Sequence, residues 1–286
     1  MKSVLGTGLS GLVGSKIVEV LGGEFSFLNL DLTNKVDILD IKTVERAISQ
    51  SDADTLIHMA AFTNVDAAFE QEGDTNGVCY RVNVLGTDNI ARVAKEYGKH
   101  LIHISTAFVF DGENEGMYVE EDAVSPIEWY GKTKAMAEEV VQKQSDSWTL
   151  FRIDQPFRSD PFAKPDTAHK LLDKLKTGSI YPLFTDHWFS PTSIEDFAEV
   201  LRWAVEHKPQ GIFHATCNQK ISDYEYGQMI AKTHEIECEI PQGSLVEYKK
   251  TLKRPYQTNT AMSSDKLIRE SGLKPAVLKE RIAQIL

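Results

Sequence analysis

The segment TGLSGLVG, residues Thr7–Gly14, follows a short apolar run at Ser3–Leu5 and leads into an amphipathic stretch at Leu12–Leu21. It contains three glycines, at Gly8, Gly11 and Gly14. Between a strand and a helix, one glycine permits the tight turn, another lets a phosphate approach the backbone, and the third allows close helix packing. The free N–H groups and the helix dipole then face the anion. The segment therefore predicts a turn that binds a dinucleotide pyrophosphate, although three glycines in such a turn can also be purely structural.

Apolar runs and amphipathic stretches continue to alternate through the first half of the chain. The further apolar runs are Ser26–Leu30, Thr55–Ala60, Leu101–Ser105 and Thr149–Ile153. The helix-period stretches between them are Thr43–Ser49, Val78–Tyr97 and Trp129–Lys143. This alternation is typical of βαβ units, and it predicts an α/β fold with a doubly wound parallel sheet of the Rossmann type.

The alternation becomes irregular after Ile153 and resumes with a helical stretch at Ile194–Glu206 and an apolar run at Gly211–Thr216. The irregular parts contain further helix-period stretches near Ala168–Lys176, Asp223–His234 and Val277–Leu286. We predict that residues 1–153 and 191–216 form the dinucleotide-binding domain. Residues 154–190 and 217–286 are predicted to form a smaller, discontinuous substrate-binding lobe.

Asp31 stands at the end of the second apolar run, 17 residues after Gly14. A carboxylate near this place accepts hydrogen bonds from the adenosine ribose hydroxyls, and it repels a 2′-phosphate. The sequence therefore favours NAD(H) slightly over NADP(H). Two features weaken this preference: Lys16 and Lys35 are near enough in sequence to offset the repulsion, and Asp31 can also be a solvated loop residue.

Tyr130 and Lys134 stand four residues apart in the stretch Trp129–Lys143, which places both on one helical face. A phenol titrates near about 10 in isolation, and an adjacent cation lowers its pKa and makes it a usable acid. Ser105 and Thr106 end an apolar run at the edge of the sheet that faces the crevice. A hydroxyl there is placed to bind a substrate carbonyl while Tyr130 donates a proton and a nicotinamide supplies hydride. Each part alone has a structural explanation, but their order along the chain predicts a reductase site.

The composition excludes several other classes of protein. The 286 residues include 31 Lys+Arg and 42 Asp+Glu, a formal net charge of −11, whereas nucleic-acid-binding proteins usually concentrate positive charge. No stretch approaches the roughly 20 apolar residues of a membrane-spanning helix, and no signal-peptide pattern follows Met1. The three cysteines, Cys79, Cys217 and Cys238, are widely spaced. We therefore expect a cytoplasmic protein with reduced thiols that binds neither nucleic acid nor membranes.

Motifs along nearly the whole chain carry a resemblance to a known family. Besides the glycine loop, they are Val36–Ile38, Met59–Phe69, Val82–Gly86, Ile104–Gly112, Ser125-Pro126, Tyr130–Lys134, Ser190–Thr192 and Arg254-Pro255. In these motifs the sequence resembles the extended short-chain dehydrogenase/reductase family, and within it the dTDP-4-dehydrorhamnose reductase-like branch. The resemblance implies NAD(P)H-dependent reduction of a nucleotide-linked 4-keto-6-deoxy sugar by a monomer or homodimer.

The resemblance also implies roles for individual positions. Tyr130 is the implied proton donor, Lys134 its partner and a ligand of the cofactor ribose, and Thr106 the residue that polarises the sugar carbonyl. Asn83 is implied as a buried residue that braces the active-site strands. The implied cofactor-binding residues are Gly8, Ser10, Gly11, Leu12, Val13, Asp31, Asp37, Ile38, Ala60, Ala61, Phe62, Thr63, Tyr130 and Lys134. The implied substrate-binding residues are Thr106, Ala107 and Arg254.

Three places depart from the family's pattern. Thr106 is followed by Ala107 and Phe108, where the family usually has Asp-Tyr, so one expected hydrogen bond to the sugar is lost. The stretch Arg152–Pro156 lacks an aromatic residue that often contacts the substrate. Lys16 stands where some members have a glutamate that helps to hold a metal between subunits, and we therefore predict no metal.

Two other functions fit the same motifs. A non-catalytic, NAD(P)-binding regulatory subunit, similar to the beta subunit of methionine adenosyltransferase, shares them and is the second prediction after the reductase. A nucleotide-sugar 4-epimerase needs little beyond Thr106, Tyr130 and Lys134 and is the third. A 4,6-dehydratase usually has carboxylates directly after the active-site threonine, and Ala107 and Phe108 cannot replace them.

Overall fold

The computed structural model describes residues 1–286, and at its centre is a parallel sheet with the strand order β2-β1-β3-β4-β5-β8. The strands are β1 (Lys2–Thr7), β2 (Phe25–Asn29), β3 (Thr55–His58), β4 (His100–Thr106), β5 (Trp148–Ile153) and β8 (Gly211–His214). Each lies on an apolar run of the sequence, and the predicted fold class is confirmed. The direction of winding reverses between β1 and β3, because β2 lies on one side of β1 and β3 on the other. Ligands of such sheets bind at the carboxyl ends of the strands beside this reversal.

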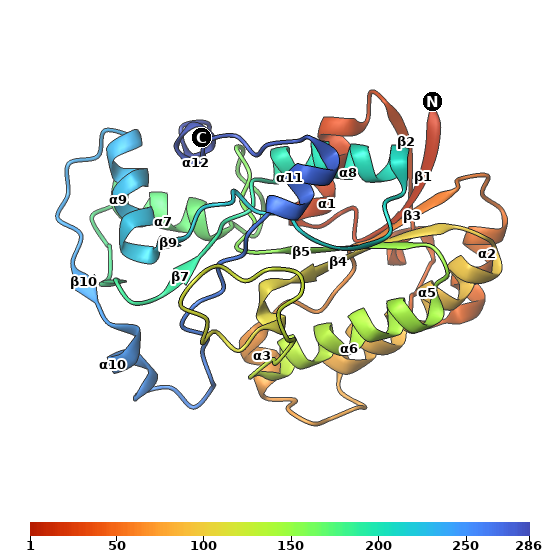
Figure 1. The fold of residues 1–286 in the computed structure, drawn as a ribbon, viewed down its shortest axis with the longest axis horizontal. Coiled ribbons are helices and arrows are strands. Elements are labelled where there is room, and N and C mark those ends of the chain that lie inside the picture. Colours follow the sequence, from red (N-terminus) through yellow and green to blue (C-terminus); the bar gives the residue numbers. More distant parts are fainter.

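The sheet carries an apolar core on each face, since side chains of a strand alternate between its two sides. Val4, Ile102 and Phe151 pack on one side and Leu5 and Leu101 on the other. Helices α1 (Leu12–Leu21) and α8 (Ile194–His207) cover the first face, and α2 (Ile41–Ser49), α5 (Thr87–Glu96) and α6 (Trp129–Gln144) cover the second. Figure 1 shows the sheet between these two layers.

A third core forms a lobe at one end of the molecule (Figure 1). Its helices are α7 (Thr167–Lys176), α9 (Asp223–Thr233), α10 (Leu245–Lys249) and α12 (Leu278–Ile282). Its short strands are β6 (Leu183–Phe184), β7 (Trp188–Phe189), β9 (Ile221–Ser222) and β10 (Gln242–Gly243). One element departs from the sequence division, which assigned residues 217–286 to the lobe: Leu267 of α11 (Asp265–Ser271) packs into the sheet core. This helix contacts the edge strand β8, whose apolar side chains need a cover.

The predicted helix Val78–Tyr97 is interrupted. It consists of α4 (Val78–Tyr80), a π-helical turn at Arg81–Gly86, and then α5, and it follows the short helix α3 (Val65–Phe69). Single π-helical turns often occur at functional sites. This one contains Asn83, whose side chain faces the loop after β3 and the helix α6.

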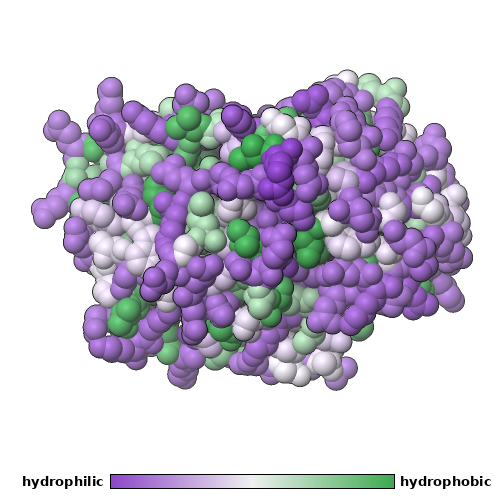
Figure 2. Space-filling view, in the orientation of Figure 1, coloured by the Kyte–Doolittle hydropathy of each residue, from purple (hydrophilic) through white to green (hydrophobic).

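The surface is mostly hydrophilic on the face drawn in Figure 2, where hydrophobic residues form only small groups. None of the helices has both the length and the apolar character that crossing a membrane requires. All three cysteines are free thiols.

Candidate active site

The glycine loop has the backbone geometry that its sequence predicts. Gly8 adopts a left-handed conformation with φ of +69°, and a Cβ there would lie 2.7 Å from the Ala60 nitrogen. A Cβ on Gly14 would lie 2.4 Å from the Gly8 carbonyl oxygen. Gly11 is the N-cap of α1 and has no side chain to cap it, so the first-turn N–H groups of Leu12 and Val13 are left for an anion. These features fit a dinucleotide pyrophosphate.

Asp31 lies beside the glycine loop, as its predicted role requires. One carboxylate oxygen accepts hydrogen bonds from Ser10 Oγ at 2.8 Å and Asn29 Nδ2 at 2.7 Å. The other accepts from Thr33, from its hydroxyl at 2.6 Å and its backbone N–H at 3.0 Å, and from the Asn34 backbone. These bonds, led by that from the Thr33 hydroxyl, lower the pKa of Asp31. Its charge therefore persists next to the loop, although much of its accepting capacity is already used within the chain.

Lys16 does not offset the charge of Asp31, although its position in the sequence had suggested that it could. Its ammonium is buried against other carboxylates, 2.8 Å from a Glu19 carboxylate oxygen and 2.7 Å from one of Asp160. Arg158 joins the same cluster and donates to the Leu12 carbonyl at 3.2 Å and to Ser15 Oγ at 2.8 Å. The segment after β5 is thereby attached to the first turns of α1. No group of three or more His, Cys, Asp or Glu side chains is arranged to hold a metal ion, and the absence of a metal stays a prediction.

The other predicted cofactor residues follow the carboxyl edge of the sheet. The Ala60 N–H donates to Thr7 Oγ1 at 3.1 Å, and the Phe62 N–H donates to Asn83 Oδ1 at 2.7 Å. Ala61 is half-buried and Thr63 is exposed. Ile38 packs against the start of α5, where a Cβ on Gly86 would lie 2.6 Å from its Cδ1, and Asp37 accepts from the Leu39 N–H at 2.9 Å.

Tyr130 and Thr106 come together because α6 begins against the turn that follows β4. Glu128 caps the helix and accepts from the N–H groups of Tyr130 at 2.8 Å and Gly131 at 2.6 Å. A Cβ on Gly131 would lie 2.2 Å from the Phe108 carbonyl oxygen, so only glycine permits this close approach. Burial of the ring raises the phenol pKa of Tyr130, and the nearby Thr106 hydroxyl acts in the opposite direction with a smaller effect.

The sequence predicts that the Lys134 ammonium lowers the pKa of Tyr130, and the contacts of Lys134 do not fit this. Its Nζ donates to the Ile104 carbonyl at 2.8 Å and to His103 Nε2 at 3.2 Å, and the side chain is 2% exposed. Burial lowers the pKa of Lys134 to about 8, opposed by the nearby Glu138 carboxylate. The expectation that the ammonium lowers the phenol pKa is therefore wrong for this arrangement, in which both groups are buried and the ammonium contacts β4 instead.

Ala107, one of the predicted substrate residues, lies in the protein interior. It is fully buried in a small core with Val109 and Phe110, because the short helical turn Ala107–Val109 directs its side chain inward. The next residue, Phe108, is half-buried and packs edge-to-face against Tyr130 with ring centroids 5.8 Å apart. The residue beside the phenol is thus Phe108 and not Ala107.

Arg254 reaches the site from the far end of the chain. Its Nε donates to Asp66 Oδ1 at 2.9 Å, and its guanidinium lies 4.9 Å from the centre of the Tyr256 ring. Its charge also acts to lower the pKa of Glu128, whose pKa is raised overall by burial. The structure therefore brings Arg254 near the start of the Tyr130 helix, on the side of the lobe.

The sequence offered Ser105 together with Thr106 as the hydroxyl for the substrate carbonyl, and the structure separates the two. Ser105 Oγ donates to Glu138 at 2.5 Å, so its hydroxyl faces α6, and Thr106 alone faces Tyr130. Glu138 also binds Arg152 through Nε at 3.0 Å and Nη2 at 2.7 Å, with both side chains almost fully buried. No sequence pattern pairs these two residues, since Glu138 lies in the helix-period stretch Trp129–Lys143 and Arg152 in the apolar run Thr149–Ile153.

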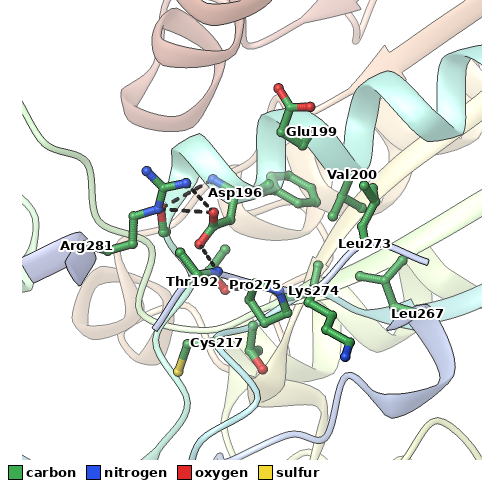
Figure 3. A pocket seen from close by; sticks show the side chains of 15 residues that line it. Thr192, Asp196, Glu199, Val200, Cys217, Leu267, Leu273, Lys274, Pro275 and Arg281 are labelled. Carbon is green, nitrogen blue, oxygen red and sulfur yellow. Dashed lines mark hydrogen bonds and ion pairs between the residues drawn. The ribbon is translucent and has the colours of Figure 1, made fainter. Parts of the chain in front are cut away.

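A separate pocket of about 270 Å³ lies between α8 and the segment Leu273–Ala276 (Figure 3). Asp196 on its rim accepts from Arg281 Nε at 3.1 Å and from the Ala276 N–H at 3.3 Å. The apolar lining residues include Phe197, Val200, Ala215, Leu267 and Leu273. None of the predicted catalytic, cofactor or substrate residues lines this pocket, which lies where α8 meets the lobe helix α12.

Comparison with known proteins agrees with this geometry. The family described as RmlD substrate binding domain matches residues 1–286. A dTDP-4-dehydrorhamnose reductase of Aggregatibacter actinomycetemcomitans is 28% identical over 292 residues, which cover 96% of this chain and 95% of that protein. Methionine adenosyltransferase 2 subunit beta of Rattus norvegicus is 28% identical over 248 residues, which cover 80% and 71%. The crystal structure of a dTDP-4-dehydrorhamnose reductase from Bacillus anthracis in complex with NADP has the same fold, with a TM-score of 0.89, 22% identity, and coverage of 100% and 99%.

Proposed function

The chain belongs to the RmlD substrate binding domain family, and we propose that it is an NAD(P)-dependent oxidoreductase that reduces the keto group of a nucleotide-linked 4-keto-6-deoxy sugar. The observation that supports this most directly is the convergence of Thr106, Tyr130 and the glycine loop at one edge of the sheet. The reductases among the relatives act on a sugar of this class by name. We propose the same class for this chain and leave the individual sugar and nucleotide to the experiment.

The proposed mechanism assigns one task to each side chain. A bound nicotinamide supplies the hydride. Thr106 donates a hydrogen bond to the keto oxygen and orients it toward the phenol of Tyr130. Tyr130 then gives its proton to that oxygen as negative charge develops on it. The burial that raises the phenol pKa keeps Tyr130 protonated until the carbonyl is reduced, which suits a proton donor.

Tyr130→Phe tests the assignment of the proton donor. Because general acids typically contribute about 10²–10⁴ in rate, turnover of the keto-sugar should fall by that factor while the dissociation constant for NADH stays within about twofold. The measurement is NADH and NADPH oxidation across a panel of nucleotide-linked 4-keto sugars, and Phe108→Leu is a matched control for the loss of a neighbouring ring contact. A Tyr130→Phe variant that reduces the sugar at the wild-type rate would remove Tyr130 from the mechanism.

We further propose that the chain prefers NAD(H). Asp31 keeps its negative charge beside the glycine loop, and the ammonium of Lys16 does not balance it because that ammonium is paired with Glu19 and Asp160. A 2′-phosphate near this carboxylate is repelled. Asp31→Asn preserves most of the local hydrogen bonds but removes the charge, so kcat/KM for NADPH should rise relative to NADH. An unchanged ratio would mean that Asp31 does not select the cofactor.

Arg254 is the proposed contact for the diphosphate of the substrate. Its guanidinium is held by Asp66, whose carboxylate is 87% exposed, so an anionic ligand competes only with a weak, solvent-screened pair. Arg254→Gln should raise KM for the nucleotide sugar and leave the affinity for NADH unchanged. Equal losses in both would place Arg254 in a general structural role.

A regulatory, non-catalytic role is the second candidate, since methionine adenosyltransferase 2 subunit beta is a relative of similar identity. The same panel of keto sugars separates the two functions. If no substrate is turned over but NAD(P)H still binds, the regulatory role is favoured. Turnover without net NADH oxidation, with tightly retained NAD, would favour a 4-epimerase.

A further inference from the structure

A row of buried polar side chains runs beneath the start of the Tyr130 helix. It comprises Thr7 on β1, His58 on β3, His103 on β4 and Lys134 on α6, and all four side chains are at most 2% exposed. Thr7 is the cross-strand partner of His58, and His58 is that of His103. The row therefore crosses the sheet at the carboxyl edge, where the glycine loop and the catalytic candidates also lie.

The partners of His58 fix its protonation. Thr87 donates its hydroxyl proton to the Asn83 carbonyl at 2.7 Å, so its oxygen accepts from His58 Nε2 at 2.9 Å. Thr7 accepts the Ala60 N–H and donates to His58 Nδ1 at 2.7 Å. Both ring nitrogens are satisfied in the neutral form, and burial lowers the pKa of His58 to about 3.

His103 has a different and incomplete set of partners. Its Nε2 lies 3.2 Å from Lys134 Nζ, which has only N–H groups to offer when it is charged, so Nε2 accepts and Nδ1 carries the ring proton. That Nδ1–H is buried without any partner. An unpaired buried donor costs free energy, and its presence at this position calls for a reason beyond packing.

We propose that His103 is a positioning residue for Lys134: its neutral ring accepts one N–H of the ammonium, the Ile104 carbonyl accepts a second, and one N–H remains for the cofactor ribose. This inference rests on the proposed function, because the position of Lys134 matters only if a cofactor binds beside it. The adjacent neutral His58 completes the arrangement, since its ring lies 5.3 Å from that of His103 and adds no second positive charge.

The groups that face Lys134 determine how its charge responds to pH. His103 and His58 face it from the sheet as neutral rings, and Tyr130 lies one helical turn away in its protonated form. Glu138 lies one turn further along α6 and favours the charged form, but it is already paired with Arg152. Burial is the largest effect on the pKa of Lys134, which falls to about 8. The ammonium is therefore present below that pH and is lost as the pH rises through it.

The test measures the affinity for NADH as a function of pH, by fluorescence titration, from about two units below to about two units above the pKa of Lys134. The affinity of the wild type should fall as the pH rises through about 8, where Lys134 loses its charge. We call this fall in affinity at high pH the alkaline limb. His103→Leu removes the acceptor, so the alkaline limb should shift to lower pH by about one to two units. That is the size expected when an ammonium loses a charge-assisted hydrogen bond. His103→Gln, which restores an acceptor, should return the limb to its wild-type position.

His100→Leu is the matched control, because His100 is equally buried on the same strand but binds Ser147 and Thr149 instead of Lys134. Its alkaline limb should coincide with that of the wild type. If His103→Leu does not fold, His103→Met, with its weak thioether acceptor, carries the same expectation. An unmoved limb in the His103 variant, an equal movement in His100→Leu, or an affinity independent of pH would overturn the inference. None of these results decides keto-sugar turnover, on which the proposed function separately depends.

Discussion

Replacing Arg152 by methionine should destabilise the protein more than any surface substitution. Arg152 is 1% exposed, and its guanidinium makes two hydrogen bonds to Glu138, which also accepts from Ser105. In Arg152→Met the Glu138 carboxylate stays buried with only the serine hydroxyl as partner. Breaking a buried pair in this way costs about 3–5 kcal/mol, a large part of the roughly 5–15 kcal/mol that stabilises a typical domain.

The assay is urea denaturation followed by circular dichroism, with Arg202→Met as the control. Arg202 pairs with Glu199 at the surface, where the two side chains are 36% and 43% exposed, so its loss should cost less than about 1 kcal/mol. The double variant Arg152→Met/Glu138→Leu removes the orphaned charge and should regain at least about 2 kcal/mol of the loss. A single variant as stable as Arg202→Met, or a double variant less stable than Arg152→Met, would refute the reasoning.

Two further predictions concern packing and pH. Gly131→Ala should lower the free energy of unfolding by about 1–3 kcal/mol and reduce keto-sugar turnover, because its Cβ would press α6 away from the Phe108 carbonyl; unchanged thermal denaturation and turnover would contradict this. His100 is nearly fully buried, and its pKa of about 4 lies below the usual 6.5, so the folded state loses stability as the pH falls between these values. Between neutral pH and pH 4, His100→Leu should therefore lose less free energy of unfolding than the wild type, by up to about 3 kcal/mol. Unfolding curves measured across this pH range test this, and an equal pH dependence of stability in the two proteins would rule out the contribution of His100.

Much of the fold follows from local patterns. Each strand of the sheet lies on an apolar run, because strands buried on both faces need apolar side chains in sequence. The glycine loop is only partly local: the backbone of the loop itself requires Gly14, whereas Gly8 is required by its left-handed conformation and by the distant segment at Ala60. The interruption of the helix Val78–Tyr97 by a π-helical turn was not predicted, since nothing in its periodicity distinguishes the turn from a regular helix.

The order of Thr106, Tyr130 and Lys134 in the sequence predicted that they share an edge of the sheet, and their elements indeed meet there. Their chemistry was less predictable. A spacing of four residues places Tyr130 and Lys134 on one helical face, but the contacts of Lys134 with His103 and Ile104 depend on how α6 packs on β4. The same packing buries the phenol, and so its pKa is raised where the sequence predicted a lower value.

Local patterns are enough to predict the doubly wound sheet, the turn for a pyrophosphate, and the strand end and helix that carry the catalytic candidates, because these depend on periodicity and on residues adjacent in the chain. Tertiary structure alone decided which side chains meet. The contacts of Glu138 with Ser105, of Lys16 with Asp160 and of Arg254 with Asp66 join residues from separate elements, the last pair 188 positions apart. Burial is equally a property of the assembled fold, and burial is what determines whether Tyr130, Lys134 and His103 carry a charge.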